Sequence, residues 1–302
     1  MRATRSRLAP TRRTSTPARR SLDHRPSKCN NGRRAKGPER AGRPARRERN
    51  GRRAMKGVSA VARILKLEGV EYLFCFPANP LIDAAAELGI RPMLARSEKT
   101  LLNMADGYTR VSNGDRNGVV VVQAGPGIEN AFGGVAQAFS DSIPVLVLPG
   151  GPNQHRVGVP TSFDPLRAYR SITKWVDRIN FPDRISEQMR RAFTQLRTGQ
   201  PGPVVLEVPQ DVGGAEVDEA TFRYTPVRGH RSAGDPQDVA EAARALLAAR
   251  SPLLHVGHGV LWAKAWDELR ELAELVQAPV MTTMAAKSVF PEDHPLAAGV
   301  GG

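Results

Sequence analysis

Apolar residues between positions 56 and 211 alternate between helical and strand-like spacing. Val58, Val61 and Leu65 recur at the three- and four-residue intervals of an amphipathic helix. The continuous apolar run Gly118–Val122 is typical of a strand buried on both faces of a parallel sheet. A helix-like segment through Ala138 separates it from a similar run at 143–148, and an amphipathic helix at 185–196 precedes another run at 204–208. The pattern predicts an α/β domain with a doubly wound parallel sheet over residues 55–211.

The segments that follow this domain predict a linker and a second unit. Residues 212–236 are polar and rich in Gly and Pro, so we interpret them as a linker. Residues 237–302 predict helices at 237–249 and 262–276 and strands at 253–256 and 279–283. This length is short for a doubly wound fold, and we expect 237–302 to be part of a truncated central α/β domain. Within the first domain, we expect Asp183 to cap a helix over 185–196.

The net charge of +14 comes from the first 54 residues, which hold 19 Lys/Arg and 3 Asp/Glu. This stretch has no hydrophobic periodicity and no aromatic residue, and its composition predicts a disordered arm. Clustered arginines could bind nucleic acid, and acid-poor N-termini occur in organelle transit peptides. We favour a third interpretation, in which the stretch is not native and Met55 is the start, because domain-like sequence begins there.

Two cysteines, Cys29 and Cys75, provide neither a disulfide framework nor a thiolate metal site. No apolar run reaches the length of about 18 residues that a membrane span needs. We therefore expect a cytoplasmic protein. His255 and His258 lie close together in the sequence, but no acidic or Cys partners accompany them, so we interpret them as turn residues and expect no metal ligands in this chain.

Two motifs suggest chemistry. Glu98 follows a short strand-like segment at 92–95 and begins the next helix, which continues through the sequence Ala-Asp-Gly-Tyr-Thr-Arg at 105–110. The turn Gly125–Gly127 follows the buried strand, and Asn130, Asp141 and Pro144 come after it. Ligands of open α/β sheets bind at the carboxyl edge, where both motifs are expected to lie.

The order of these motifs resembles the pyrimidine-binding domain of thiamine-diphosphate enzymes, and acetolactate synthases most of all. The similarity continues through residues 172–174, 190–193 and 199–204, and Phe290–Pro295 is similar to the central domain of the same family. The resemblance covers nearly all of residues 56–302. It implies that this is a cofactor-dependent enzyme which decarboxylates or condenses 2-oxo acids.

The resemblance implies that Glu98 is catalytic and binds the cofactor. In the family this carboxyl group hydrogen-bonds N1′ of the aminopyrimidine and favours the imino tautomer that removes the thiazolium C2 proton. The competing interpretation is a solvent-exposed glutamate stabilised at a helix N-terminus. The resemblance also places a set of residues beside the cofactor pocket, although the turn itself could serve a purely structural purpose: Gln123, Gly125, Pro126, Gly127 and Asn130.

The chain departs from the family pattern near the expected substrate end. Ser97 stands where the family has His, and Ala78 and Asn79 stand where acetolactate synthases have Gly-Gly. Phe163 is a loosely aligned candidate for a substrate-side aromatic residue. These positions leave the identity of the 2-oxo acid open.

The resemblance further implies thiamine diphosphate as cofactor, with Mg²⁺ and the diphosphate held by a third domain whose motifs do not occur in this sequence. FAD occurs in some relatives. We expect a homo-oligomer, at least a dimer, or a separate subunit that supplies the diphosphate domain, and we expect this chain to be inactive alone. The competing hypotheses are a non-catalytic truncated fragment that folds and dimerises, and a nucleic-acid-binding protein with a basic arm.

Overall fold

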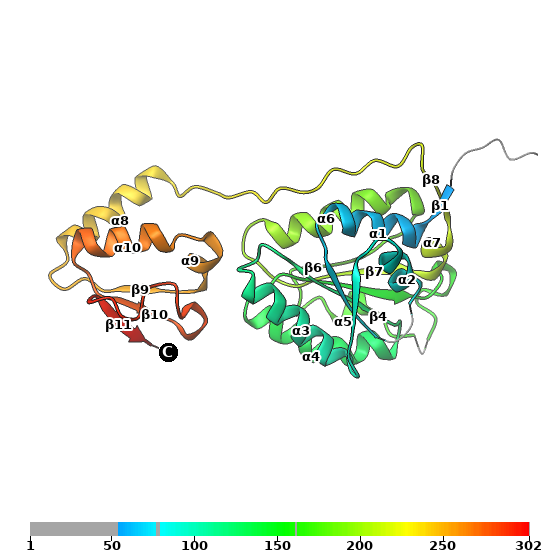
Figure 1. Cartoon of the computed structure of the whole chain (residues 1–302), viewed down its shortest axis with the longest axis horizontal. Helices are drawn as coiled ribbons and strands as arrows, with labels where there is room; N and C mark the ends of the chain where they lie inside the picture. Colours follow the sequence, from blue (N-terminus) through cyan, green and yellow to red (C-terminus); the bar gives the residue numbers. More distant parts are fainter. Residues whose placement is uncertain (1–53, 77–78, 161, 302) are drawn as a thin grey trace, which may run out of the picture. The chain divides into compact units, whose positions relative to one another are not determined.

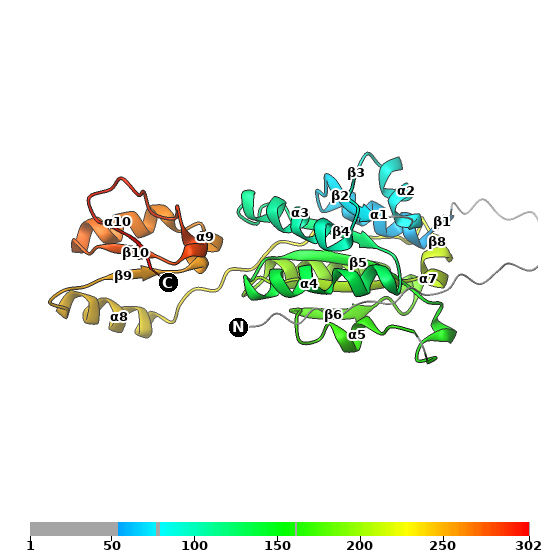
Figure 2. The ribbon, with the colours of Figure 1, turned by 90° about the horizontal axis from the view of Figure 1, so that it is seen from below.

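The first domain is built on one parallel sheet (Figure 1). The computed structural model describes residues 54–76, 79–160 and 162–301. Six strands pair in parallel in the order β3-β2-β4-β5-β7-β6, and Figure 2 shows the sheet with β3 at one edge and β6 at the other. They are β2 (Tyr72–Phe76), β3 (Arg91–Leu94), β4 (Gly118–Val122), β5 (Val145–Gly151), β6 (Trp175–Arg178) and β7 (Val204–Pro209). The predicted doubly wound α/β fold is confirmed.

Helices cover both faces of this sheet. Helices α1, α2 and α6 pack on one face, and α3 and α4 pack on the face turned toward the viewer in Figure 2. Short crossovers of this kind bring parallel strands together and bury both faces. The bounds are α1 (Gly57–Leu67), α2 (Pro80–Glu87), α3 (Glu98–Val111), α4 (Pro126–Ser140), α5 (Pro165–Ala168) and α6 (Ile185–Arg197).

The central strand β4 shows how the sequence specifies these layers. Val119 and Val121 belong to the core under α1, and Val120 and Val122 belong to the core under α3 and α4. All four side chains are fully buried. Successive residues of a strand face opposite sides, so an uninterrupted valine run fits a strand covered on both faces. Each buried valine contributes about 1.5–3 kcal/mol relative to exposure.

The end of the first domain differs from the prediction. Residues 212–214 belong to α7 (Gln210–Gly214), and β8 (Glu216–Asp218) pairs antiparallel with β1 (Ala54–Lys56). The segment expected to be a linker from residue 212 is therefore regular up to 218. Polar composition was misleading because a short edge strand need not bury its side chains: Glu216 is exposed, and Val217 and Asp218 are only half-buried. The expected cap at Asp183 is also wrong: the turn η2 (Pro182–Arg184) precedes α6, whose N-cap is Arg184 without a side-chain hydrogen bond.

The C-terminal unit is a small α/β layer. Its strands β9 (Leu254–Val256), β10 (Val280–Thr282) and β11 (Ala297–Val300) form a parallel sheet in the order β11-β10-β9. The single helix expected over 262–276 is two helices, α9 (His258–Ala263) and α10 (Trp266–Val276), because Lys264 adopts a left-handed conformation that ends α9. Helix α8 (Pro236–Ala248) has no buried residue. Two short turns complete the described elements: η1 (Gln154–Arg156) and η3 (Met284–Ala286).

Some expectations fall on residues that the structure does not describe. The arm expected over 1–54 lies outside the described residues except for Ala54, which begins β1. Ala78 lies outside them as well. No described helix is long and apolar enough to cross a membrane.

Candidate active site

Glu98 is the first residue of α3, directly beyond the carboxyl end of β3. Ser97 precedes it in an extended conformation and caps the helix: its Oγ accepts a hydrogen bond from the Thr100 N–H at 3.3 Å. The Ser97 hydroxyl also lies 2.9 Å from Thr100 Oγ1. The serine in place of the family's histidine is therefore engaged in helix capping, which fixes the direction of the first turn.

The Glu98 side chain is buried and has no partner among the residues that the structure describes. The residue is only 6% exposed, which excludes the interpretation of a solvent-exposed glutamate. Among the described residues it has no hydrogen bond or ion pair. Its carboxylate oxygens are nevertheless not completely enclosed by protein atoms. Solvent, or a ligand, can therefore still reach these oxygens. A carboxyl group in this state can accept a hydrogen bond from an entering ligand or donate one to it.

The strand order places a topological switch point next to Glu98. The chain runs from β2 outward to β3 and then returns across β2 to β4. Crevices at such points, outside the carboxyl ends of the strands, bind ligands in open α/β sheets. The loops after β3, β2 and β4 carry Glu98, Asn79 and Gln123, so the structure brings these three predicted residues to one edge of three adjacent strands.

Asn79 holds two loops of this edge together. Its Oδ1 accepts a hydrogen bond from the Leu81 N–H at 3.0 Å and caps α2, while its Nδ2 donates to the Val122 carbonyl at 3.3 Å. The asparagine that replaces the family's glycine thus connects the end of β2 to the end of β4. This contact gives Asn79 a structural role next to the switch point.

The turn after β4 requires its glycines. Gly125 is the N-cap of α4 and has φ 65°, where an L side chain is strained. Pro126 occupies the first turn of the helix, and a Cβ on Gly127 would lie 3.0 Å from the Cβ of Gln123. The structural interpretation of this motif is supported by these contacts. Gln123 and Asn130 are exposed at the surface beside it.

Phe163 lies on another part of the edge. It is half-buried beyond β5 and meets the ring of Tyr169 edge-on, with centroids 6.4 Å apart. Burial raises the pKa of Tyr169, whose hydroxyl donates to the Ile128 carbonyl in α4. Strands β2 and β4 separate β3 from β5 in the sheet, so Phe163 and Glu98 belong to loops of different, non-adjacent strands.

The sequence did not reveal a buried ion pair near the same edge. Arg178 in β6 donates from Nε to Glu207 in β7, and the two side chains are 11% and 2% exposed. Burial raises the pKa of Glu207, and the Arg178 guanidinium partly offsets this. A Cβ on Gly151 would lie 2.7 Å from Glu207, so the glycine at the end of β5 makes room for the carboxylate. Isolated charges in apolar strands give no periodic signal that could have identified the pair.

The family-like sequence Asp-Gly-Tyr-Thr-Arg at 106–110 connects helix α3 to helix α4. Arg110 in α3 hydrogen-bonds Asp106 through Nε and reaches Asp141, the C-cap of α4, with Nη2 2.5 Å from Oδ2. These bonds raise the pKa of Arg110. Gly134 allows close approach of the same helices, because its Cβ would lie 2.4 Å from that of Leu102. This motif supports the scaffold that carries Glu98.

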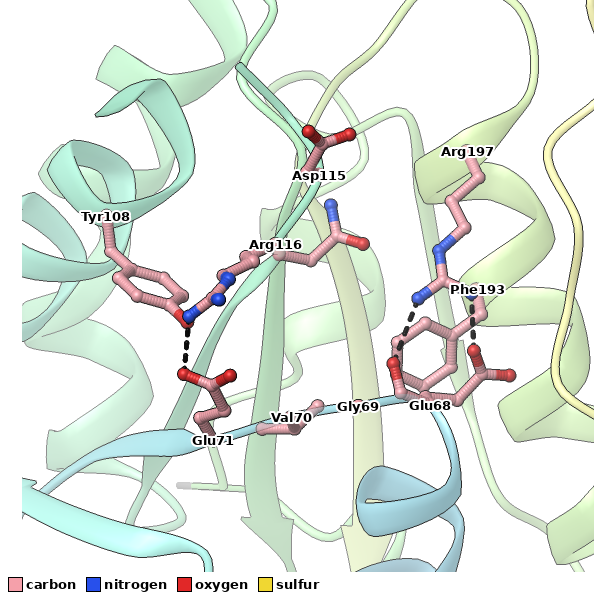
Figure 3. Close-up of a pocket in the computed structure, with 10 residues that line it drawn as sticks. Glu68, Gly69, Val70, Glu71, Tyr108, Asp115, Arg116, Phe193 and Arg197 are labelled. Carbon is pink, nitrogen blue, oxygen red and sulfur yellow. Dashed lines mark hydrogen bonds and ion pairs between the residues drawn. The ribbon is translucent and has the colours of Figure 1, made fainter. Parts of the chain in front are cut away.

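A pocket at the opposite edge of the sheet does not belong to this site. Figure 3 shows it at the amino ends of β2 and β4, between the pairs Glu68–Arg197 and Glu71–Arg116. Its volume of about 20 Å³ suffices for a water molecule and not for a cofactor. The described residues contain no group of three His, Cys, Asp or Glu side chains arranged to hold a metal ion.

Comparison with known proteins relates both parts of the chain to one family. Residues 55–177 match the thiamine pyrophosphate enzyme N-terminal TPP binding domain, and residues 239–302 match the central domain of thiamine pyrophosphate enzymes.

Curated relatives agree with these matches. A probable acetolactate synthase large subunit of Methanocaldococcus jannaschii is 36% identical over 258 residues, which cover 82% of this chain and 43% of that protein. Acetolactate synthase of Arthrospira platensis is 33% identical (82% and 44% covered), and the large subunit of Corynebacterium glutamicum is 32% identical (82% and 41% covered). The chain thus spans less than half the length of these relatives. It belongs to the family of thiamine-pyrophosphate-dependent enzymes that resemble acetolactate synthase.

Proposed function

We propose that this chain supplies the aminopyrimidine side of a thiamine diphosphate site in an enzyme that decarboxylates or joins 2-oxo acids. The observation that carries the proposal is Glu98: a buried carboxyl group with no hydrogen bond or ion pair among the described residues, beside the switch point of a domain that matches the family's TPP binding domain. Acetolactate synthases are among the relatives that this chain resembles, and the proposal takes its reaction class from them.

In this proposal Glu98 holds a proton at one atom of the ligand, the pyrimidine N1′. A carboxyl group at this position can share a proton with a ring nitrogen of the ligand, and the burial of Glu98 shields that contact from water. Thiamine diphosphate, when bound, supplies the carbanion and the electron sink of the reaction. Ser97 fixes the first helical turn, and Asn79 and the Gly125–Gly127 turn shape the neighbouring loops.

The diphosphate and Mg²⁺ would be held by residues outside the span that this chain shares with its relatives, in another domain or a separate subunit. The partner surface that we propose is α4, where Phe132 and Phe139 are 39% and 42% exposed on a helix whose other face is buried. Large exposed aromatic side chains are typical of contact surfaces. The proposal includes no FAD, and a cytoplasmic location stays an expectation.

The test is the exchange rate of the thiazolium C2 proton of bound thiamine diphosphate, followed by NMR in the assembled holoenzyme. Glu98→Gln keeps the shape of the side chain and should slow exchange by about 10²–10⁴-fold, the usual contribution of a positioned acid or base. Glu129→Gln is the matched control, because Glu129 also lies in the first turn of a helix but is exposed. Exchange in Glu98→Gln within a few-fold of the wild-type rate would refute the proposal and favour a non-catalytic fragment.

A further inference from the structure

Residues 219–229, which we call the strap, follow β8 and contain no helix or strand beyond the turn at 219–221. The side chains of Phe222, Tyr224 and Val227 are nevertheless half-buried. Phe222, Tyr224 and Val227 pack against the core cluster that includes α1 and α6. A segment with the composition of a linker is therefore bound to the surface of the first domain.

A buried glutamate in α1's C-cap position holds the strap. The Glu68 side chain is 0% exposed. Its Oε1 accepts a hydrogen bond from the Val227 N–H at 3.0 Å and another from the Tyr224 hydroxyl, while its Oε2 accepts from Arg197 Nη1. Bonds of this kind to a charged acceptor are about twice as strong as neutral ones.

Arg197 at the end of α6 completes the attachment. Its Nη1 also donates to the Val227 carbonyl at 2.8 Å, and its Nη2 donates to the Glu68 carbonyl at 3.3 Å. The backbone of Val227 is thus bound through both its donor and its acceptor. Two further arginines lie over aromatic rings of the strap: Arg63 over Phe222 at 5.4 Å and Arg190 over Tyr224 at 5.6 Å.

We propose that the strap is an integral part of the first domain, latched by Glu68 and Arg197, and that residues 230–235 alone form the free tether to the C-terminal unit. Six residues reach at most about 20 Å, whereas a tether starting at 212 would reach about 80 Å. A shorter tether raises the effective concentration of one unit around the other. Release of the latch would lengthen the tether without changing either fold.

The pocket in Figure 3 lies next to the two residues that hold the strap. It lies beside the latch, and Glu68 and Arg197 line it together with the exposed pair Glu71–Arg116. Both glutamates point toward an arginine, but the Glu71 and Arg116 side chains are 47% and 53% exposed. Glu68 and Glu71 therefore offer a matched comparison, because the Glu68–Arg197 pair of the latch is buried and the Glu71–Arg116 pair is exposed to solvent.

Limited trypsin digestion of the full chain tests the latch. Arg223 and Arg228 lie in the strap and Arg231 lies in the tether, and the side chains of all three are exposed. A protease cuts only where the backbone opens, so we expect wild-type protein to be cut after Arg231 well before Arg223 or Arg228. Glu68→Gln should speed cleavage at the two strap sites about ten- to a hundredfold, and Tyr224→Phe about five- to tenfold.

Glu71→Gln is the control and should leave cleavage at the strap sites within about twofold of wild type. Hydrogen exchange of the β4 amides reports whether the whole domain has opened. If Glu68→Gln loses that protection, the milder Tyr224→Phe variant decides the outcome. Equal cleavage at Arg228 and Arg231 in wild type would overturn the proposal, as would a Tyr224→Phe variant cut no faster than Glu71→Gln.

Discussion

The buried pair Arg178–Glu207 offers a strong test of the energetics of this fold. In Arg178→Met, the Glu207 carboxylate keeps a side-chain exposure of about 2% but loses the guanidinium that neutralises it. Breaking a buried pair by removing one partner costs about 3–5 kcal/mol. Domain stabilities are about 5–15 kcal/mol, so the loss should be a large fraction of the total. The double variant Arg178→Met/Glu207→Met removes both charges and should recover most of it.

The loss of unfolding free energy in Arg178→Met should depend on pH. Burial already raises the pKa of Glu207, and removing Arg178 abolishes an influence that lowers it. A carboxyl group whose folded pKa exceeds its unfolded value binds more protons when folded. Its contribution to stability is fully present below the unfolded pKa and is lost as the pH rises through the folded pKa. The deficit of Arg178→Met relative to wild type should therefore be smaller near pH 4.5 than near pH 7.5.

Urea unfolding followed by far-UV circular dichroism at the two pH values gives both quantities. Arg116→Met is the matched control, because Arg116 pairs with Glu71 in solvent and the pair should contribute less than about 1 kcal/mol. A deficit below about 1 kcal/mol for Arg178→Met at pH 7.5 would refute the reasoning. So would a deficit that is the same at both pH values.

Three further substitutions test how the loops near Glu98 are built. Asn79→Ala removes the cap of α2 and the bond to Val122 and should lower the free energy of unfolding by about 1–2 kcal/mol, whereas Asn79→Asp keeps the cap and should lose less. Gly125→Ala places a side chain at φ 65° and should cost about 1–2 kcal/mol in a denaturant titration. Gly134→Ala brings a Cβ within 2.4 Å of that of Leu102 and should lower the stability by about 1–3 kcal/mol; an unchanged melting temperature would show that α3 and α4 separate easily.

The sequence by itself determined the fold class and the position of Glu98 at the start of a helix. Both follow from local periodicity: the valine run of β4 is specified by burial on two faces, and the Ser97–Glu98 step is a local capping signal. The family resemblance was also carried by short motifs, and the comparisons confirmed it over residues 55–177 and 239–302.

The tertiary structure alone decided which charges are buried and which irregular segment packs on the core of the first domain. Glu68, Glu98 and Glu207 look alike in sequence, yet one is bound by three donors, one has no partner among the described residues, and one is paired with Arg178. Their partners lie on segments far apart in the chain, and nothing in local composition encodes such distances. For the same reason a polar, irregular strap was indistinguishable from a linker until Arg197 and Glu68 were seen to hold Val227.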